Sequence, residues 1–541
     1  MPQRPKSRPA GRPAPDDSID TVAFVSLGCP KNLVDSEKML GLLAEDGVTP
    51  VAYDLAEQGE PVDAVVVNTC GFLEASKDES LSVIKDAIER KRAGQVKRVV
   101  VAGCLVQRHR ARMLEWAPGI DAMVGVFDRD KIVQAVRGAG DQARARRARS
   151  AAQASDGPRY WIHANALTAA ADLGLKTVGL TVQGKDGKGI GYFEDDRSRL
   201  RLTPRHYAYL RVSEGCNQNC AFCTIPSIRG KMRSKPLEPL VAEARELIAD
   251  GCFELNLIGQ DTTSYGDDIG VGLASPAGGL PGMLRAVGRA FDEVGIREGW
   301  VRLMYAYPSN FSDECIAALA DTPRVLPYVD MPLQHASDRM LTAMRRHITL
   351  DHTRRLLDRL RARMPAIALR TTFISGFPGE TDADHRQLLD FVREQRFENV
   401  GVFEYSREPG TVAGTMEDDP ALAVPAQVKA QRRAEIMELQ QTIAFERQLG
   451  RAARAEQADV LIDAPLRARG RATSGVGAGG RLYQGRTAAQ APQIDSVTFV
   501  QSSRQLAPGE LVRCTITGAD GYDLVARPVE DAEKRLPLKV L

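Results

Sequence analysis

The chain alternates short apolar runs of β-forming residues with longer helix-forming stretches, and this alternation constrains its fold more than any other feature. In the N-terminal part, the β-type runs cover 22–27, 64–68 and 98–102, and the clearest helical stretches cover 32–46 and 75–93. Strands that alternate with helices predict a parallel sheet with helices on both faces. We therefore expect a doubly wound α/β domain over residues 20–137.

The same alternation continues through the middle of the chain. Candidate strands cover 207–213, 254–258, 300–306, 328–331, 368–375 and 400–405, and intervening helices include 239–250, 338–346 and 382–394. Six β/α units predict a partial parallel (β/α)6 barrel over residues 203–450, with its functional site at the carboxyl ends of the strands. A charged helix-forming stretch, 427–450, leads out of this barrel.

The C-terminal part has a different pattern. Short β-type runs at 460–462, 480–485, 494–500, 510–517 and 522–526 are separated by Gly, Pro and Asp. This pattern predicts a small antiparallel β-barrel over residues 455–528. A length of 541 residues is typical of about three domains.

Two segments lack a regular pattern. We expect residues 1–19, which are rich in proline and arginine, to form a disordered tail, because they lack the apolar core of a secretion signal. Residues 138–202 are interpreted as a linker or insert. The linker contains a basic run at 143–149, interpreted as a solvated helix or linker rather than an RNA contact, and a glycine- and lysine-rich loop at 184–191.

Charge and cysteine content narrow the class of protein. The chain has 72 basic and 70 acidic residues, so no global charge signal indicates nucleic acid. No apolar run approaches the length of a membrane span. Nine cysteines without a secretion signal indicate metal or redox chemistry in a reducing compartment, and we expect a cytoplasmic protein.

Three of these cysteines lie in one short run, Glu-Gly-Cys-Asn-Gln-Asn-Cys-Ala-Phe-Cys, directly after the first barrel strand. Cys216, Cys220 and Cys223 provide three thiolates and no fourth. Zinc sites normally close with four Cys or His ligands, and a disulfide is not expected in a reducing compartment. The run resembles the radical S-adenosylmethionine superfamily. That resemblance implies a 4Fe–4S cluster whose fourth iron binds S-adenosylmethionine.

Three further cysteines are far apart in the sequence but share one structural position. Cys29, Cys70 and Cys104 each lie just past the carboxyl end of a predicted N-terminal strand. Ligands of open α/β sheets bind at that edge. We therefore expect these cysteines to converge and to hold a second cluster. The alternative is three unrelated core cysteines, because free cysteine is often buried.

Other loops at predicted strand ends resemble cofactor-binding segments of the superfamily. The resemblance implies that Gln260, after the second barrel strand, is near the methionyl amino group of the cofactor. The turn Gly376-Phe377-Pro378-Gly379-Glu380, after the fifth strand, would line the adenine side. Glycine would allow close backbone approach there. The alternative for Glu380 is that it caps the following helix at Thr381.

The loop after the fourth barrel strand contains Gln334 and His335. Gln334 is a candidate for hydrogen bonding to the cofactor. His335 is a possible proton carrier, but a structural role is at least as plausible, so no residue is assigned as catalytic. A guanidinium group can bind a carboxylate substrate through two hydrogen bonds. The sequence does not choose among the arginines near strand ends or the cysteine run: Arg229, Arg233, Arg302 and Arg370.

The order of these features resembles the methylthiotransferases, and the ribosomal-protein branch in particular. The matching runs begin at Ser26, Ile225, Gly259 and Asp330. The resemblance implies methylthiolation of the β-carbon of an aspartate in small-subunit ribosomal protein twelve. One S-adenosylmethionine would provide a 5′-deoxyadenosyl radical and a second would provide the methyl group, with sulfur delivered through the auxiliary cluster. The terminal barrel would be the family's TRAM module, and an electron donor such as flavodoxin would be required.

Two other functions remain open at this point. A tRNA methylthiotransferase that modifies an adenosine near the anticodon would share every cofactor residue. A non-enzymatic iron–sulfur sensor or scaffold would have no use for the cofactor-binding turns. The interspersed acids and bases of the terminal barrel favour a protein substrate over tRNA. The remaining cysteines, Cys252, Cys315 and Cys514, are interpreted as core residues.

Overall fold

The structure is a computed structural model, and it describes residues 18–53, 61–110, 112–138, 196–271, 278–466 and 481–532, with the backbone alone at 160–161, 176–178 and 181–183. The chain divides into two compact units. The first contains most of the N-terminal part, and the second contains the remainder together with two short segments, Cys29–Glu37 and Phe72–Glu74. Each unit is described by itself.

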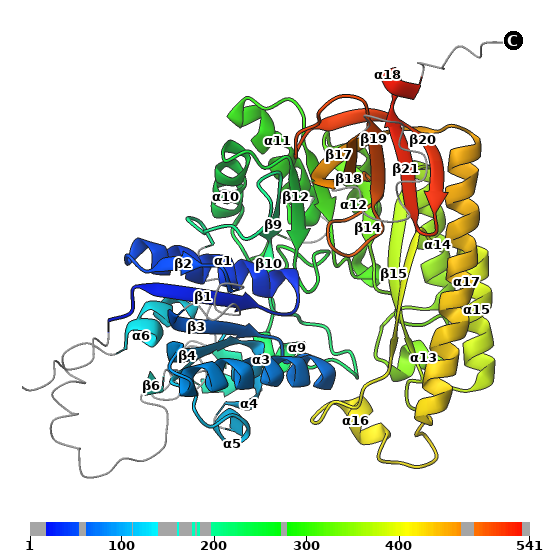
Figure 1. The fold of residues 1–541 in the computed structure, drawn as a ribbon. Helices are drawn as coiled ribbons and strands as arrows, with labels where there is room; N and C mark the ends of the chain where they lie inside the picture. Colours follow the sequence, from blue (N-terminus) through cyan, green and yellow to red (C-terminus); the bar gives the residue numbers. More distant parts are fainter. Residues whose placement is uncertain are drawn as a thin grey trace, which may run out of the picture. The chain divides into compact units, whose positions relative to one another are not determined.

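The first unit contains a six-stranded parallel sheet (Figure 1). Its strand order is β2 (Thr49–Val51), β1 (Thr21–Ser26), β3 (Val62–Thr69), β4 (Val96–Gly103), β5 (Ala122–Val124) and β6 (Tyr160–Trp161). The order reverses between β1 and β3, which is the position where doubly wound sheets bind ligands. Strand β6 falls in the range that the sequence assigned to the linker, because a two-residue strand has no detectable periodicity.

Helices cover both faces of this sheet, as Figure 1 shows. On one face, Val65 and Val67 of β3 pack against α3 (Glu74–Arg92), α4 (Cys104–His109) and α5 (Arg112–Trp116). On the other face, Ala64 and Val66 pack against α6 (Ile132–Arg137) and the C-terminal half of α1 (Pro30–Glu45). Strands that are buried on both faces become continuously apolar, which explains the Val62–Thr69 and Val96–Gly103 runs. The doubly wound prediction is confirmed.

The second unit contains a second six-stranded parallel sheet, open at both edges. Its order is β16 (Asn399–Glu404), β15 (Ala368–Ser375), β14 (Val325–Asp330), β13 (Trp300–Leu303), β12 (Glu254–Ile258) and β9 (Tyr207–Arg211). The main helices around it are α10 (Leu237–Ala249), α11 (Gly279–Val294), α12 (Asp313–Asp321), α14 (Leu350–Arg363), α15 (Asp382–Gln395) and α17 (Ala426–Ala453). The largest apolar core lies between these layers, and the predicted partial barrel is confirmed.

Two predicted strands end earlier than expected, for local reasons. Strand β9 stops at Arg211, and the chain then forms β10 (Ser213–Glu214), which pairs antiparallel with β11 (Arg233–Ser234). Strand β13 stops at Leu303 because Tyr305 adopts a left-handed backbone with φ of 59°. Left-handed non-glycine residues are strained and cluster at functional sites. Both changes occur at the carboxyl end of the barrel.

The C-terminal strands close into a barrel in the order β17 (Gln457–Leu466), β18 (Arg481–Thr487), β19 (Thr498–Ser502), β21 (Asp523–Pro528) and β20 (Leu511–Asp520). The predicted small barrel is confirmed, with one parallel pair, β19 with β21, among its antiparallel neighbours. Strand β19 begins four residues later than predicted, because Asp495 accepts a hydrogen bond from the Ala491 N–H and holds a turn before it.

Several predictions fall on residues outside the described ranges. They are most of the N-terminal tail (1–17), the basic run at 143–149 and the glycine-rich loop at 184–191. Within the linker range, the backbone of β7 (Lys176–Val178) and β8 (Thr181–Gln183) forms an antiparallel pair. The domain boundaries stay predictions. Among the described residues, no helix is both long and apolar enough to cross a membrane.

Candidate active site

The loop with Cys216, Cys220 and Cys223 leaves the barrel directly after β10. Its first turn requires glycine at position 215, where φ is +77° and an added Cβ would lie 2.2 Å from the Lys231 carbonyl oxygen. The Cys216 N–H donates to the Gly230 carbonyl, which closes the loop against the segment that precedes β11. This strand-end geometry places the cysteines at the carboxyl edge, where barrel sites are found.

Hydrogen-bond donors surround the three sulfur atoms. Backbone N–H groups of Gln218 and Ile225 donate to the Sγ atoms of Cys216 and Cys223, each at 3.4 Å. Arg346 donates from Nη1 to Cys220 Sγ at 3.5 Å, and its guanidinium lies 4.1 Å from the Tyr307 ring centroid. Donors of this kind stabilise thiolates and tune iron–sulfur clusters.

The thiols of Cys216 and Cys223 are compatible with a cluster. Burial raises the pKa of Cys216 and of Cys223 to about 12, so metal binding would have to displace their protons. Within the described ranges, no three His, Cys, Asp or Glu side chains converge as ligands of a single metal ion. That result is compatible with a 4Fe–4S cluster, because each cysteine there binds a different iron and the thiols need not meet at one point.

Gln260 follows β12, and only one of the two polar atoms of its side-chain amide has a hydrogen-bond partner. Its amide Nε2 donates to Glu214 Oε1 at 2.8 Å. Because a carboxylate only accepts, the amide oxygen must point the other way. That buried oxygen has no hydrogen-bond partner among the described residues. It could accept a hydrogen bond from an ammonium group, such as the amino group of S-adenosylmethionine.

Asp261, next to Gln260, has a local structural role. Its carboxylate accepts hydrogen bonds from the Thr263 hydroxyl at 2.9 Å and the Ser264 hydroxyl at 2.7 Å. It also accepts from Gln218 Nε2 in the cysteine loop at 2.9 Å. Asp261 therefore ties the loop after β12 to the cysteine loop.

Gln334 and His335 follow β14 and differ in role. Gln334 has a left-handed backbone with φ of 74°, held by two backbone hydrogen bonds to Thr372 and Ile374 of β15. His335 is buried, and its Nδ1 accepts from the N–H groups of Ala336 and Ser337, both at 2.9 Å. These bonds give Nδ1 a structural role, whereas Nε2 is buried without a hydrogen-bond partner among the described residues, 3.8 Å from Glu380 Oε1.

The turn after β15 is held by Glu380. Its Oε2 accepts from the N–H groups of Gly376 and Phe377. The alternative that Glu380 caps helix α15 is wrong, because Thr381 and Asp384 form that capping box between themselves. Gly376 has φ of +71°, and an added Cβ would lie 2.2 Å from Lys429 Cγ of α17. The glycine therefore allows the backbone of the turn to pack closely against the Lys429 side chain.

Phe377 is fully buried. Its ring packs edge-on against Tyr405 with centroids 5.5 Å apart, in a cluster that includes Ala221 of the cysteine loop. The side chain therefore links β15 to the cysteine loop, and contact with a cofactor would have to come from the backbone of this turn.

In the first unit, the loops with Cys70 and Cys104 lie close together. An added Cβ on Gly71 would lie 2.7 Å from the Leu105 Cα, next to Cys104. The Ser80 hydroxyl of α3 donates to the Cys70 carbonyl at 3.0 Å. Gly28, which immediately precedes Cys29, also packs on Cys70, since its added Cβ would lie 2.8 Å from the Cys70 Cβ. The three cysteines follow the neighbouring strands β1, β3 and β4 at their carboxyl ends.

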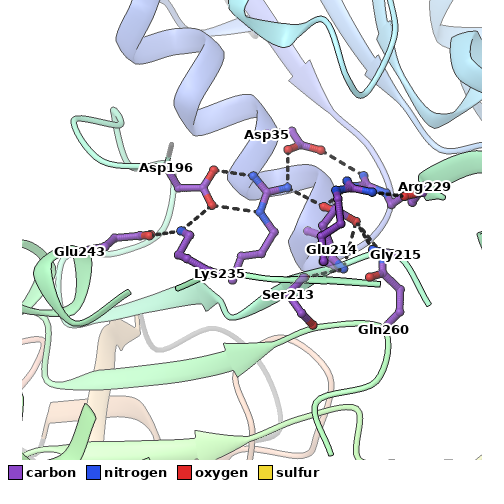
Figure 2. Close-up of polar contacts among 12 residues, drawn as sticks. Asp35, Asp196, Ser213, Glu214, Gly215, Arg229, Lys235, Glu243 and Gln260 are labelled. Carbon is purple, nitrogen blue, oxygen red and sulfur yellow. Dashed lines mark hydrogen bonds and ion pairs between the residues drawn. The ribbon is translucent and has the colours of Figure 1, made fainter. Parts of the chain in front are cut away.

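A buried network of charges includes Glu214, Asp35 and Asp196, as Figure 2 shows. Glu214, two residues before Cys216, accepts from Arg229 at 2.9 Å and Arg211 at 2.8 Å, and pairs with Lys31 at 3.2 Å. Burial alone would raise the pKa of Glu214, but Arg229 and Lys31 outweigh it and hold the pKa well below its usual range. We define the buried ion network as Lys31, Asp35, Asp196, Arg211, Glu214, Arg229, Lys235 and Glu243.

The candidate arginines are mostly committed to protein carboxylates. Arg302 donates to Glu254 at 2.7 Å, Arg370 to Asp330 at 2.7 Å, and Arg229 to Glu214 and Asp35. Arg233 donates to the carbonyls of Arg229 and Lys231. These contacts give no reason to assign a substrate carboxylate to any of them.

The sequence reasoning did not single out Lys31, Asp35 and Arg346. Lys31 and Asp35 lie in the run that begins at Ser26, and their i, i+4 spacing on a predicted helix places them on one face. This spacing, directly after Cys29, was the sequence signal that could have identified Lys31 and Asp35. Arg346 had none, because it lies 126 residues from Cys220.

Three families match parts of this chain. The Radical SAM superfamily matches residues 210–392, Uncharacterized protein family UPF0004 matches residues 21–125, and the TRAM domain matches residues 456–529. A solved structure of the radical S-adenosylmethionine methyltransferase TsrM from Kitasatospora setae is 15% identical and covers 77% of this chain and 85% of that chain, with a TM-score of 0.46.

Curated relatives match nearly the whole chain. Ribosomal protein uS12 methylthiotransferase RimO from Anaeromyxobacter sp. strain K is 41% identical over 93% of this chain and 92% of the relative. The protein of the same name from Symbiobacterium thermophilum is 39% identical over 97% of this chain and 93% of the relative.

The partial barrel with its three-cysteine loop and the superfamily match define a radical S-adenosylmethionine enzyme. The identity over nearly the full length is more specific. The chain belongs to the family of ribosomal protein uS12 methylthiotransferases. It is a methylthiotransferase, and its cofactors are two 4Fe–4S clusters and S-adenosylmethionine. The predictions of fold class, enzyme class and cofactors are confirmed.

Proposed function

We propose that this protein methylthiolates the β-carbon of an aspartate in ribosomal protein uS12, the small-subunit protein twelve. The observation that carries the proposal is the 41% identity over 93% of the chain to a relative named for that substrate. The site is consistent with it, since the chain has two separate sets of three cysteines at the carboxyl ends of two parallel sheets.

In this proposal, Cys216, Cys220 and Cys223 hold the cluster that binds S-adenosylmethionine. When bound, that cluster supplies the electron for reductive cleavage of S-adenosylmethionine and so enables hydrogen abstraction from the aspartyl β-carbon. The unpartnered Gln260 amide oxygen would accept from the cofactor's amino group. Gln334, in its strained left-handed backbone, and the backbone of Gly376 and Phe377 are the other proposed cofactor contacts.

Cys29, Cys70 and Cys104 would hold the auxiliary cluster. When bound, that cluster would supply the sulfur for the transfer, and a second S-adenosylmethionine would supply the methyl group. The support is topological, because all three cysteines follow adjacent strands on either side of the point where the strand order reverses.

The partners follow from this reaction. The reductive step requires an electron donor, and we propose a small redox protein such as flavodoxin. Action on a ribosomal protein places the enzyme in the cytoplasm, with nucleic acid only as a ribosome contact.

The charge of the terminal barrel supports a protein substrate over the tRNA alternative. Two of its arginines are offset by nearby acids: Arg504 pairs with Glu510 and Glu530, and Arg513 pairs with Asp459. A barrel that binds RNA relies on unneutralised Lys and Arg contacts to phosphate.

The direct test is the intact mass of uS12 from cells with and without this gene. We expect the mass increment of one methylthio group replacing one hydrogen to disappear in the deletion strain and to return on complementation. An unchanged uS12 mass would contradict the proposal. If a methylthio-adenosine were lost from digested tRNA instead, the tRNA alternative would replace it.

A further inference from the structure

Three buried polar atoms near the turn after β15 have no hydrogen-bond partner among the described residues. They are His335 Nε2, Glu380 Oε1 and His385 Nδ1, and each of these residues is at most 5% exposed. His335 Nε2 lies 3.8 Å from Glu380 Oε1, and His385 Nδ1 lies 4.0 Å from the same oxygen. Both distances exceed the roughly 2.7–3.2 Å of a direct hydrogen bond. Buried polar atoms are usually satisfied by protein or by ordered water, so these three require an explanation.

The hydrogen-bond partners of His335 decide which of its ring nitrogens carries hydrogen. Nδ1 accepts from the N–H groups of Ala336 and Ser337, both at 2.9 Å. A ring nitrogen that accepts carries no hydrogen of its own, so the ring hydrogen is on Nε2. His335 therefore directs a buried donor toward Glu380.

His385 presents the opposite group to the same carboxylate. Its Nε2 lies 2.7 Å from Glu435 Oε2, and because a carboxylate only accepts, Nε2 is the donor of that bond. The neutral ring then has its lone pair on Nδ1, which lies 4.0 Å from Glu380 Oε1. Two acceptors therefore face each other, and neither can satisfy the other.

One donor and two acceptors match the bonding capacity of a water molecule. Water can accept from His335 Nε2 and donate one hydrogen each to Glu380 Oε1 and His385 Nδ1, and about three hydrogen bonds are typical of a buried water. A metal cation does not fit, because the His335 Nε2–H group has no lone pair to offer. Among the described residues, no three ligand side chains converge on a metal ion. The Glu380 carboxylate would repel an anion.

The site joins four elements of the second unit. His335 lies in the loop after β14, Glu380 in the turn after β15 and His385 on α15. From α17, Arg432 Nη1 donates to the Glu380 carbonyl at 3.1 Å and lies 3.6 Å from Glu380 Oε1, and Glu435 holds His385. A water molecule on Glu380 Oε1 would complete the connection between the two loops and the two helices.

Glu380 passes its position on to the backbone of the turn. Its Oε2 accepts from the N–H groups of Gly376 and Phe377, and the backbone of these two residues is proposed to line the adenine side of S-adenosylmethionine. His335 directly follows Gln334, another proposed cofactor contact. A group that bridges His335 and Glu380 would therefore fix these two loops relative to each other.

We infer that a buried water molecule binds to His335 Nε2, Glu380 Oε1 and His385 Nδ1, and that these three residues are positioning residues for the turn after β15. The inference rests on the proposed function, which assigns that turn to cofactor binding. The adenine side is remote from the bond that is cleaved. Loss of the water should therefore weaken S-adenosylmethionine binding and leave the rate of cleavage at saturation close to that of the wild type.

The first test is a high-resolution crystal structure of the reconstituted full-length enzyme. We expect one ordered water within hydrogen-bond distance of all three atoms. Crystals grown in rubidium chloride should show no anomalous peak there, because the site excludes cations. A rubidium peak would overturn the inference, as would direct contact of His335 Nε2 with Glu380 and no water between them.

Two variants remove the water contacts while keeping the other bonds of each ring. In His335→Asn, the side-chain oxygen can replace Nδ1 as the acceptor for Ala336 and Ser337, and the Nε2 donor is lost. In His385→Gln, the amide nitrogen can replace Nε2 as the donor to Glu435, and the Nδ1 acceptor is lost. We expect the affinity for S-adenosylmethionine to fall about three- to tenfold in each variant, the effect of losing one hydrogen bond.

Hydrogen exchange provides a readout that does not depend on activity. The peptide covering residues 374–381 should exchange its amide hydrogens faster in both variants than in the wild type, without added S-adenosylmethionine. If Nδ1 alone gave His335 its role, His335→Asn would match the wild type in exchange and in affinity. That result in both variants would overturn the inference, as would a lower saturating rate with unchanged affinity.

His206→Asn is the matched control. His206 is also buried, at 4% exposed, but it contacts Asp463 directly at 2.8 Å at the amino end of the barrel. Its affinity for S-adenosylmethionine and the exchange of residues 374–381 should equal those of the wild type. Equal changes in this variant would mean that loss of any buried histidine loosens the turn.

Failure of the proposed function would look different. If the wild type modified tRNA instead of uS12, the substrate assignment would fail, and all three measurements would still apply. If the wild type bound no S-adenosylmethionine, the proposed cofactor contacts would fail, and the crystal structure and the hydrogen exchange would still decide whether the water holds the turn.

Discussion

The two ends of the parallel barrel in the second unit both contain buried ion networks, and the two differ in what they touch. At the carboxyl end, Glu214 pairs with Lys31 and two arginines next to the cysteine loop. At the amino end, Glu254, the first residue of β12, pairs with Arg302 of the barrel and Arg486 of the terminal barrel. Both carboxylates are almost completely buried, and their partners hold the pKa of each below its usual range.

The comparison shows that burial and arginine pairing alone do not distinguish a carboxylate near the cofactor site from one that joins two domains. The amino-end network joins one barrel to the other, with His206 and Asp463 adding a contact at 2.8 Å. The carboxyl-end network adjoins the residues proposed to hold the cofactors. In parallel barrels, function collects at the carboxyl ends of the strands and stability at the amino ends. The following predictions test that division, from the largest expected effect to the smallest.

Removing a cluster ligand should have the largest effect. Cys216→Ala should abolish 5′-deoxyadenosine formation, because the cluster that binds S-adenosylmethionine loses a ligand. Cys70→Ala should retain that product while stopping methylthiolation. Both are measured by chromatography and mass spectrometry after reduction, with Cys315→Ala, a buried helix residue, as the control that keeps its iron. Continued 5′-deoxyadenosine formation in Cys216→Ala would refute the cluster assignment.

Removing the charge of Glu254 should lower stability by several kcal/mol without changing chemistry. Glu254→Gln leaves Arg302 and Arg486 buried without their shared carboxylate, a change that typically costs about 3–5 kcal/mol. Urea unfolding measures the loss, and 5′-deoxyadenosine formed per folded enzyme at low temperature should match the wild type. Normal stability and low activity in Glu254→Gln would contradict the proposal that the amino end serves stability and the carboxyl end serves function.

Gly215→Ala should lower iron content at the carboxyl end. The added methyl group would lie 2.2 Å from the Lys231 carbonyl oxygen, so the backbone before Cys216 must move. Gly295→Ala is a matched control, because Gly295 also has a left-handed backbone, with φ of +83°, but has nothing within 4 Å of an added Cβ. Iron and sulfide analysis after reconstitution should show a loss in the first variant only. Equal losses of iron in the two variants would mean that strain in the left-handed backbone, rather than the clash with Lys231, causes the loss.

Acid should weaken the amino-end contacts slightly. Burial opposes ionisation of Asp463, but His206 and Arg486 outweigh it and lower its pKa. A lowered pKa in the folded state gives stability that is present above the unfolded value of about 4 and is lost as pH falls below it. The melting temperature of Asp463→Asn should therefore depend less on pH than that of the wild type between about pH 5 and 3. Identical pH dependence would show that Asp463 contributes no linked stability.

The fold was predictable where local signals were strong. The strands Glu254–Ile258 and Ala368–Ser375 match their predicted ranges because strands buried on both faces are apolar throughout. The short strands β5, β6, β10 and β11 gave no usable signal, since two or three residues cannot establish a period. Strand β13 ended early because of the left-handed backbone at Tyr305, which is invisible in composition.

The residues of the candidate site also differ in whether a local sequence pattern marks them. The three-cysteine run is local and could be proposed from its spacing, whereas Cys29, Cys70 and Cys104 could be proposed only because each follows a predicted strand. The contact of Gly376 with Lys429 and the pairing of Asp35 with Arg211 join residues far apart in sequence. No local pattern marks such partners, so they required the structure.

The pairing of Asp35 with Arg211 also has a consequence for synthesis on the ribosome. The two residues are 176 positions apart, so at about 5–20 residues per second helix α1 emerges roughly 9–35 seconds before its partner arginine. During that interval, neither Lys31 nor Asp35 can form the contacts with Glu214 and Arg211 that it makes in the folded protein. The N-terminal part of the nascent chain therefore cannot reach its final form until more than a third of the protein has been made.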